Sequence, residues 1–407
     1  MDETDTDLQD TGEQAALRET VRDFCRAHAG AGAGAWKRLA GELGLTALAI
    51  GEQHGGMGAT VAEVAIAAEE LGRVLLPVPY LSTALAGAVL TEGDAAVAAM
   101  LLPGIASGAL TAAFAFGADV TVTDGRLSGA AEHVLDGAEA GLFLVPCAGD
   151  LFAVRAVDAT VTPVGTLDQT RSQAAVNFQD SLALVTGASA GRAEELMWVL
   201  LAAESVAAAE HCLEVTVAYL KTRTQFGRPI GTFQALRHRC ADLAVEVSAA
   251  RATAQAAVTA AVSAPDSLPV LAPLAKRYCV DVFGHVTAEM IQLHGGIGFT
   301  WEHEAHRYFK RAKTSQLLLG TPGQLRQLIA HRAGLFLSVP PARWQALRQA
   351  ARRPGKRAAP VSAPRASRRG PARRLPGHRG ADCGPPRRSA PGGRSDSPTP
   401  QHRRRRG

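Results

Sequence analysis

Two stretches of this chain decide how the rest is interpreted: residues 223–234 are RTQFGRPIGTFQ, and residues 292–300 are QLHGGIGFT. In the first stretch, Arg223 closes a long helical pattern, and a glycine and a proline soon afterwards turn the chain. A guanidinium at such a helix end can hold a phosphate group through two parallel hydrogen bonds. In the second stretch, Gly295–Gly296 lets the backbone approach a ligand closely and adopt positive φ.

The sequence around these stretches is mostly helical, judged by the spacing of its apolar residues. Residues 12–109 show this pattern, with Thr60 as the expected N-cap of one helix and Glu63 three residues later. A glycine-rich run at 51–58 predicts a loop between helices. In the C-terminal half, helices are predicted at 194–220, 232–262, 268–292 and within 303–332.

Residues 110–186 have a different pattern. Short runs rich in β-branched and large apolar residues, such as 120–122 and 142–145, are separated by the turn signals Asp124-Gly125 and Gly149-Asp150. These features predict a small β domain.

We therefore expect an α+β fold that is mostly α. The predicted parts are an N-terminal helical domain at 1–109, a middle β domain at 110–188, a C-terminal four-helix bundle at 189–339, and a disordered tail at 340–407.

The basic charge of the chain comes from its tail. The formal net charge is +5, but residues 341–407 hold 18 Arg, one Lys and two Asp, which is about +17 and leaves about −12 for the rest. The tail is also rich in proline and poor in large apolar residues, so disorder is predicted. A nucleic-acid-binding arm is the alternative. Because no aromatic residue beyond Trp344 interleaves the arginines, we expect no nucleic-acid partner.

The remaining composition is that of a cytoplasmic protein. The six cysteines form no C-x-x-C pair, so neither a zinc site nor a disulfide framework is expected, and reduced thiols fit a cytoplasmic location. The acidic N-terminus does not resemble a signal peptide. No uninterrupted apolar run of about 18 residues stands out, so no membrane association is expected.

In their residues, order and spacing, the two opening stretches resemble the signatures of the acyl-CoA dehydrogenase family. The resemblance implies the helical, β, helical fold and an FAD cofactor, part of which is bound by a neighbouring subunit. It is weakest in the β region, where 113–117 and 133–137 replace threonine-containing flavin contacts of the family. The FAD-contact positions that it implies are Arg223, Gln225, Phe226, Gln234, Gln292, Gly296 and Thr321.

The same resemblance leaves the catalytic base unassigned. Desaturation of an acyl-CoA removes a proton from Cα and a hydride from Cβ, and the proton step requires a carboxylate beside Cα. The two positions at which the family places that glutamate correspond to Leu319 and Met197. Glu194, Glu195 and Glu204 lie near Met197. The simpler interpretation of the first two is charges favoured at a helix N-terminus, and Glu204 is then a polar helix residue.

Three hypotheses follow. The run 295–306, GGIGFTWEHEAH, with the base-free segment after it, is similar to base-lacking subunits of bacterial acyl-CoA dehydrogenases that act on bulky thioesters, including steroid side chains. The leading hypothesis is such an FAD-binding subunit in a heterotetramer of lipid or steroid catabolism. Its partners would be an acyl-CoA thioester, a second acyl-CoA dehydrogenase-like subunit and an electron-transfer flavoprotein. The alternatives are a self-sufficient homotetramer with Glu194 or Glu195 as a displaced base, and a flavin-free scaffold.

Overall fold

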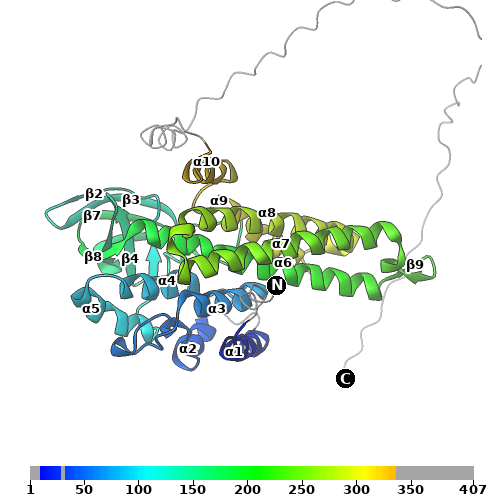
Figure 1. Cartoon of the computed structure of the whole chain (residues 1–407), viewed down its shortest axis with the longest axis horizontal. Coiled ribbons are helices and arrows are strands. Elements are labelled where there is room, and N and C mark those ends of the chain that lie inside the picture. The colour runs from blue at the N-terminus through cyan, green and yellow to red at the C-terminus, as the bar shows by residue number, and fades with distance from the viewer. Residues whose placement is uncertain (1–9, 29–32, 336–407) are drawn as a thin grey trace, which may run out of the picture. The chain divides into compact units, whose positions relative to one another are not determined.

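The computed structural model describes residues 10–28 and 33–335, and it begins with helices (Figure 1). Helix α3 starts with the predicted N-cap, because the Glu63 carboxylate accepts hydrogen bonds from both the N–H and the hydroxyl of Thr60. The predicted loop at 51–58 contains one short 3₁₀ turn. The elements of this part are α1 (Gly12–His28), α2 (Ala33–Gly41), 3₁₀ turns at Leu45–Ala47 and Glu52–His54, α3 (Val61–Arg73), α4 (Tyr80–Thr91) and α5 (Ala95–Ala106).

Two four-stranded sheets follow, with strand orders β1-β4-β5-β8 and β2-β3-β7-β6. Only β1 and β4 pair in parallel among these described strands. Phe143 from one sheet meets Phe178 from the other edge to face, within a buried apolar cluster. The strands are β1 (Ala112–Phe114), β2 (Asp119–Thr123), β3 (Arg126–Leu135), β4 (Leu142–Cys147), β5 (Asp150–Arg155), β6 (Ala159–Pro163), β7 (Gln173–Leu182) and β8 (Leu184–Ser189), with a 3₁₀ turn at Ala156–Asp158.

The rest of the described chain is a helical bundle with one small hairpin at the far end of α6 (Figure 1). The predicted mostly helical α+β fold, with N-terminal helices, a middle β part and C-terminal helices, is confirmed. The predicted tail at 340–407 lies outside the described residues. The elements are α6 (Ala190–Thr222), β9 (Thr224–Gln225), β10 (Arg228–Pro229), α7 (Gln234–Ser263), α8 (Leu268–His294), α9 (Ala305–Leu317) and α10 (Pro322–Arg332), with 3₁₀ turns at Ile230–Thr232, Pro265–Ser267 and Gly295–Phe299.

Helix α6 is the central helix of this bundle. Among the described helices it alone has the length and hydropathy that a membrane span needs, yet 83% of its most apolar window is buried inside the structure. It packs against α3, α7 and α8. At Gly72 of α3, an added Cβ would lie 2.5 Å from Cγ of Glu204, so the two helices approach too closely there for a larger residue. The apolar length of α6 therefore serves the core of the bundle.

A buried cluster of charges ties the β part to the bundle. Arg311 of α9 donates to Asp168 at 2.8 Å and to Glu204 of α6 at 2.6 Å. Arg171, just before β7, forms a second ion pair with Glu204. All four side chains are buried, and two guanidinium charges face two carboxylate charges. The cluster is thus electrically balanced, as buried ions require.

Asp136 adds a third carboxyl to this balanced cluster. Its Oδ2 accepts a hydrogen bond of 2.8 Å from the hydroxyl of Ser82 on α4. Burial raises the pKa of Asp136 from its usual 3.8 to about 6, against the opposing effects of the Ser82 hydrogen bond and of the charge on Arg171. Ionised Asp136 therefore lowers the free energy of unfolding at neutral pH.

Replacing this carboxyl should stabilise the protein. The folded state holds a proton on Asp136 between pH 3.8 and 6 that the unfolded chain has lost, so the wild type loses stability as pH rises through that window. Asp136→Asn should add up to about 3 kcal/mol to the free energy of unfolding at about pH 8, and about half as much at about pH 5.

Urea unfolding of both proteins across this pH range measures the difference. Asp119→Asn, at an exposed position on β2, is the matched control. A stability difference between Asp136→Asn and wild type that does not change with pH would contradict the assignment.

Candidate functional site

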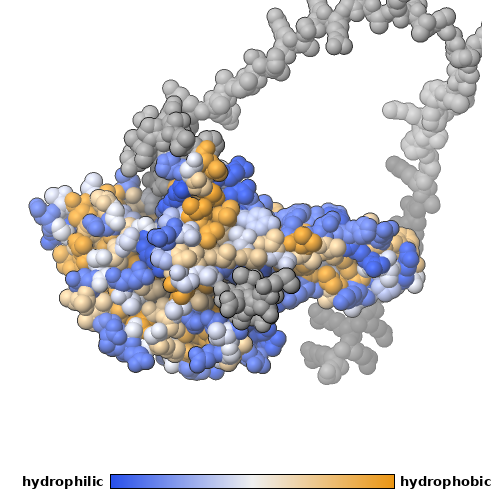
Figure 2. All heavy atoms as spheres, in the orientation of Figure 1, coloured by the Kyte–Doolittle hydropathy of each residue, from blue (hydrophilic) through white to orange (hydrophobic). Residues whose placement is uncertain are grey.

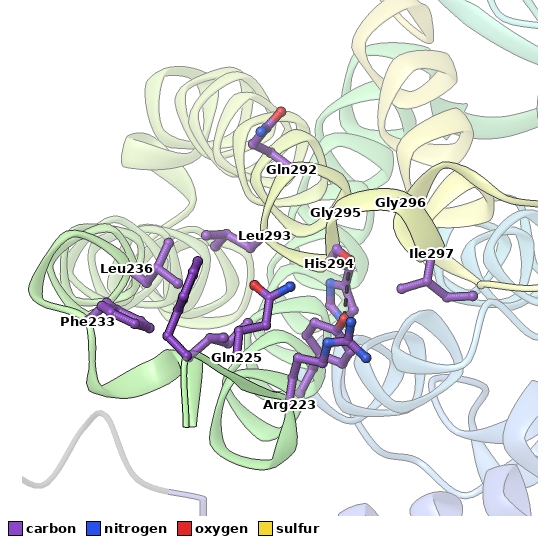
Figure 3. A pocket seen from close by; sticks show the side chains of 13 residues that line it. Arg223, Gln225, Phe233, Leu236, Gln292, Leu293, His294, Gly295, Gly296 and Ile297 are labelled. Atoms are coloured by element: carbon purple, nitrogen blue, oxygen red, sulfur yellow. Dashed lines mark hydrogen bonds between the residues drawn. The ribbon is translucent and has the colours of Figure 1, made fainter. Parts of the chain in front are cut away.

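The two sequence stretches meet at one cavity, where α6 and α8 end (Figure 3). Arg223 caps α6, and the β9–β10 hairpin follows it directly. Gln292 lies in the last turn of α8, and Gly295, with φ of 63°, turns the chain out of that helix. The cavity measures about 520 Å³, within the range of ligand pockets. Its lining is Tyr219, Arg223, Gln225, Phe226, Ile230, Phe233, Leu236 and Gln292–Ile297.

The cavity carries a positive charge and no opposing carboxylate in its lining. The Arg223 side chain is exposed, and it forms no hydrogen bond or ion pair with any other residue in the described ranges. A Cβ added at Gly295 or Gly296 would meet no atom within 4 Å, so both positions leave the backbone open. A bare guanidinium beside open backbone suits an anionic group such as the pyrophosphate of FAD.

Most of the expected FAD-contact residues are brought together here. Gln234 and Thr321 are not in the lining. The Gln234 amide lies 3.4 Å from the His238 ring, and the Thr321 hydroxyl caps α10, where it contacts Gln324. The expected residues that do line the cavity are Arg223, Gln225, Phe226, Gln292 and Gly296.

His294 also lines this cavity, although the sequence analysis does not single it out. Its side chain is only 3% exposed, and its ring centroid lies 4.4 Å from those of both Tyr219 and His303. Nδ1 lies 2.8 Å from the carbonyl oxygen of Met290, while Nε2 has no partner among the described residues. Burial lowers the pKa of His294. The sequence signal that could have identified His294 is its position directly before the glycines of the second stretch.

A second, smaller cavity of about 180 Å³ contains both positions expected for the catalytic base. Leu319 has φ of 52°, a conformation uncommon for a bulky residue. Two buried side chains hold the backbone there: Trp198 donates to the carbonyl of Leu319 at 3.0 Å, and Lys276 to that of Gly320 at 2.8 Å. The lining is Ser82, Phe114, Phe116, Glu132, His133, Leu135, Met197, Leu201 and Leu317–Leu319.

This second cavity is mostly apolar and is smaller than the usual ligand pocket. Phe114 and Phe116, from the stretch that replaces a flavin contact of the family, stack with centroids 5.0 Å apart. His133, from the other replaced stretch, has φ of 56°, and its Nδ1 lies 3.2 Å from Oε1 of Gln173.

None of the glutamates considered from the sequence lines this cavity. Glu195 pairs with Arg332 at 3.0 Å, and Glu204 is occupied by the two arginines of the buried cluster. Glu194 is half-buried in the first turns of α6. Glu132 of β3 does line the cavity, and it was not predicted from the sequence because only strand register and sheet position bring it there.

Comparisons with known proteins show the family to which the chain belongs. The family model described as acyl-CoA dehydrogenase, N-terminal domain, matches residues 11–109, and the C-terminal domain model matches residues 196–334. The chain is 38% identical over 333 residues to acyl-CoA dehydrogenase IpdE2 of Mycobacterium tuberculosis, covering 78% of this chain and 96% of that protein. It is 33% identical to FadE34 of the same organism, covering 79% of this chain and 48% of FadE34.

Solved structures give the same result for the fold. The Tcur3481-Tcur3483 steroid ACAD G363A variant superposes with a TM-score of 0.73 at 27% identity, covering 79% of this chain and 98% of that one. The ChsE4-ChsE5 complex from Mycobacterium tuberculosis superposes with a TM-score of 0.73 at 24% identity, covering 81% and 100%. The chain belongs to the acyl-CoA dehydrogenase family of FAD-dependent oxidoreductases.

Proposed function

We propose that this chain is the FAD-binding, base-lacking subunit of a heteromeric acyl-CoA dehydrogenase. The observation that carries the proposal is the pair Leu319 and Met197, which occupy the two positions expected for the family base and line one cavity. Bound FAD accepts the hydride from Cβ in this reaction. The proton at Cα requires a carboxylate, and neither of these side chains supplies one.

The role left to this chain is to hold part of the cofactor. At one surface cavity, Arg223 presents a charge for the pyrophosphate, Gln292 presents an amide, and Gly296 leaves the backbone open. The second cavity, by contrast, is narrow and has the stacked Phe114 and Phe116 rings in its wall. We therefore assign the isoalloxazine ring and the thioester to the partner subunit.

Exposed aromatic side chains beside the first cavity support a partner subunit there. Phe226 is 90% exposed, Phe299 88% and Trp301 73%, and large exposed apolar groups rimmed by polar ones mark interaction surfaces. Apolar patches (orange) also lie among polar residues along the bundle that ends at β9–β10, on the face seen in Figure 2. A second acyl-CoA dehydrogenase-like subunit in a heterotetramer would cover such a surface.

The substrate class and the setting complete the proposal. The similar Tcur3481-Tcur3483 protein is a steroid ACAD, which supports a bulky acyl-CoA thioester from lipid or steroid catabolism as the substrate. An electron-transfer flavoprotein in the cytoplasm would take the electrons. Co-expression with neighbouring genes, followed by measurement of the mass and FAD content of the purified complex, tests the whole proposal. A colourless, homomeric product would overturn it.

One observation favours a second candidate function, a self-sufficient enzyme. Glu132 is a carboxylate in the lining of the cavity that holds Leu319 and Met197, which makes it a better displaced base than Glu194 or Glu195. In that case the partner-free chain would turn over acyl-CoA, and Glu132→Gln would lower its rate by about 10²- to 10⁴-fold. Equal rates with and without this substitution would exclude Glu132.

The proposed cofactor role of Arg223 predicts the effect of removing its side chain. Arg223→Ala should cost about 2–4 kcal/mol of FAD affinity in the purified complex, because it removes a charge-assisted contact with two parallel hydrogen bonds. Equilibrium titration of the apoprotein with FAD measures the loss. Arg326→Ala, at an exposed position on α10, is the matched control and should bind FAD as the wild type does. Full flavin occupancy in Arg223→Ala would contradict the assignment.

The missing base gives a separate prediction. The isolated, unmutated chain should turn over acyl-CoA negligibly, and Leu319→Glu should leave that rate unchanged, because the thioester is assigned to the partner subunit. A gain of up to about 10²- to 10⁴-fold in Leu319→Glu would instead show that substrate enters the Leu319 cavity of this chain. Leu319→Gln, of the same shape but without the charge, should leave the rate unchanged. Stopped-flow reduction of bound flavin by acyl-CoA is the measurement.

Robust turnover by the unmutated chain without a partner would contradict the base-lacking assignment. No gain in Leu319→Glu would place substrate binding in the partner subunit alone.

A further inference from the structure

His294 lies in the same cavity as Arg223, and it is the buried polar group there that lacks a partner among the described residues. In Figure 3, the Arg223 and His294 side chains extend toward one another across the cavity. The Nδ1 contact with the Met290 carbonyl, at 2.8 Å, requires Nδ1 to carry the hydrogen. Nε2 is then a bare lone pair, enclosed and unsatisfied. Such a group in a folded protein calls for an explanation.

The surroundings of His294 keep it neutral in the free protein. From α6, Tyr219 stacks on the ring and Arg223 adds a positive charge to the shared cavity. From the segment between the 3₁₀ turn and α9, His303 also packs against the ring, and its neighbour Glu304 lies near His211, with 3.8 Å between Oε1 of Glu304 and Nε2 of His211. Burial is the largest cause of the lowered His294 pKa, His303 lowers it further, and Glu304 opposes the shift.

We propose that His294 is a second anion-binding residue of this site, which takes up a proton from solvent when a pyrophosphate-bearing ligand binds beside Arg223. The inference rests on the proposed function, because it requires that the Arg223 cavity bind the pyrophosphate of the cofactor. The proton goes to Nε2, the one ring nitrogen that is unoccupied. No other bond is formed or broken.

The physical reason is a change in local charge. Before binding, the buried His294 ring would have to carry a proton in a cavity whose lining holds the charge of Arg223 and no carboxylate. A bound pyrophosphate brings two negative charges, which reverse the sign of the local field and favour the imidazolium. His294 then contributes a second positive charge, so the ligand binds more tightly whenever that proton is available.

The pH dependence of binding follows from this linkage. Ligand affinity should rise as pH falls through the window between the pKa of His294 in the complex and its lowered pKa in the free protein. Within that window the gain approaches, and does not exceed, about tenfold per pH unit for one proton.

The experiment uses ADP-ribose as the probe and the full-length chain. ADP-ribose carries a pyrophosphate without a flavin ring, and its two charges stay constant between about pH 6 and about pH 8, the range in which histidine titrates. Calorimetric titration in two buffers of different ionisation heat counts the protons taken up on binding. The variants are His294→Gln, Arg223→Ala and, as a matched control on α10, the exposed His331→Gln.

We expect wild type and His331→Gln to bind ADP-ribose with net proton uptake and with affinity that rises on acidification. His294→Gln should bind without proton uptake and with affinity independent of pH. Retained proton uptake in His294→Gln would overturn this inference while leaving the Arg223 site intact. Binding that is unaffected by Arg223→Ala, or no binding by wild type, would overturn the proposed cofactor site, and the inference with it. Thermal melting of each variant separates these results from loss of folding.

Discussion

The placement of the smaller cavity depends on the buried ion cluster between the β part and the bundle. Arg311 from α9 and Arg171 from the edge of β7 share Glu204 of α6, and Arg311 also binds Asp168. Removing one member would leave a buried charge without its partner, at a cost of about 3–5 kcal/mol. The cluster thereby holds the β part against the bundle. Strand β3 and the segment after β1 lie on one side of this junction, and α6 and the end of α9 lie on the other. That junction is where the smaller cavity forms.

Under the proposed function, the chain separates two tasks that an acyl-CoA dehydrogenase must perform. Arg223 and the glycine loop form an open, positively charged surface suited to the phosphates of the cofactor. Leu319 and Met197, at the two positions expected for the catalytic base, lie instead in the smaller cavity. Trp198 and Lys276 hold the backbone at 319–320 through carbonyl oxygens, so this geometry does not depend on the side chain at position 319. The backbone that would present a base is thus present without the base.

Much of the fold followed from local signals. The 3.6-residue periodicity, the Thr60 capping box and the Asp124-Gly125 turn act over short distances, so sequence alone located them. The turn predicted at Gly149-Asp150 lies one residue earlier, because Asp150 already pairs with Cys147. The Arg223 and Gln292 stretches were also predicted to share a site, and the structure places both on one cavity. Two other expected contacts, Gln234 and Thr321, lie outside that cavity.

Sequence by itself determined the family, the order of helical and β parts, and the absence of glutamate at positions 197 and 319. It could not decide which glutamates are free to act as a base, because the sequence does not show which residue, about 100 positions away, pairs with each carboxylate. Only the tertiary structure showed that Glu204 is held by two arginines, that Glu195 pairs with Arg332, and that Glu132 reaches the cavity. The same holds for the partnerless nitrogen of His294, since burial and hydrogen bonding arise only when distant segments pack together.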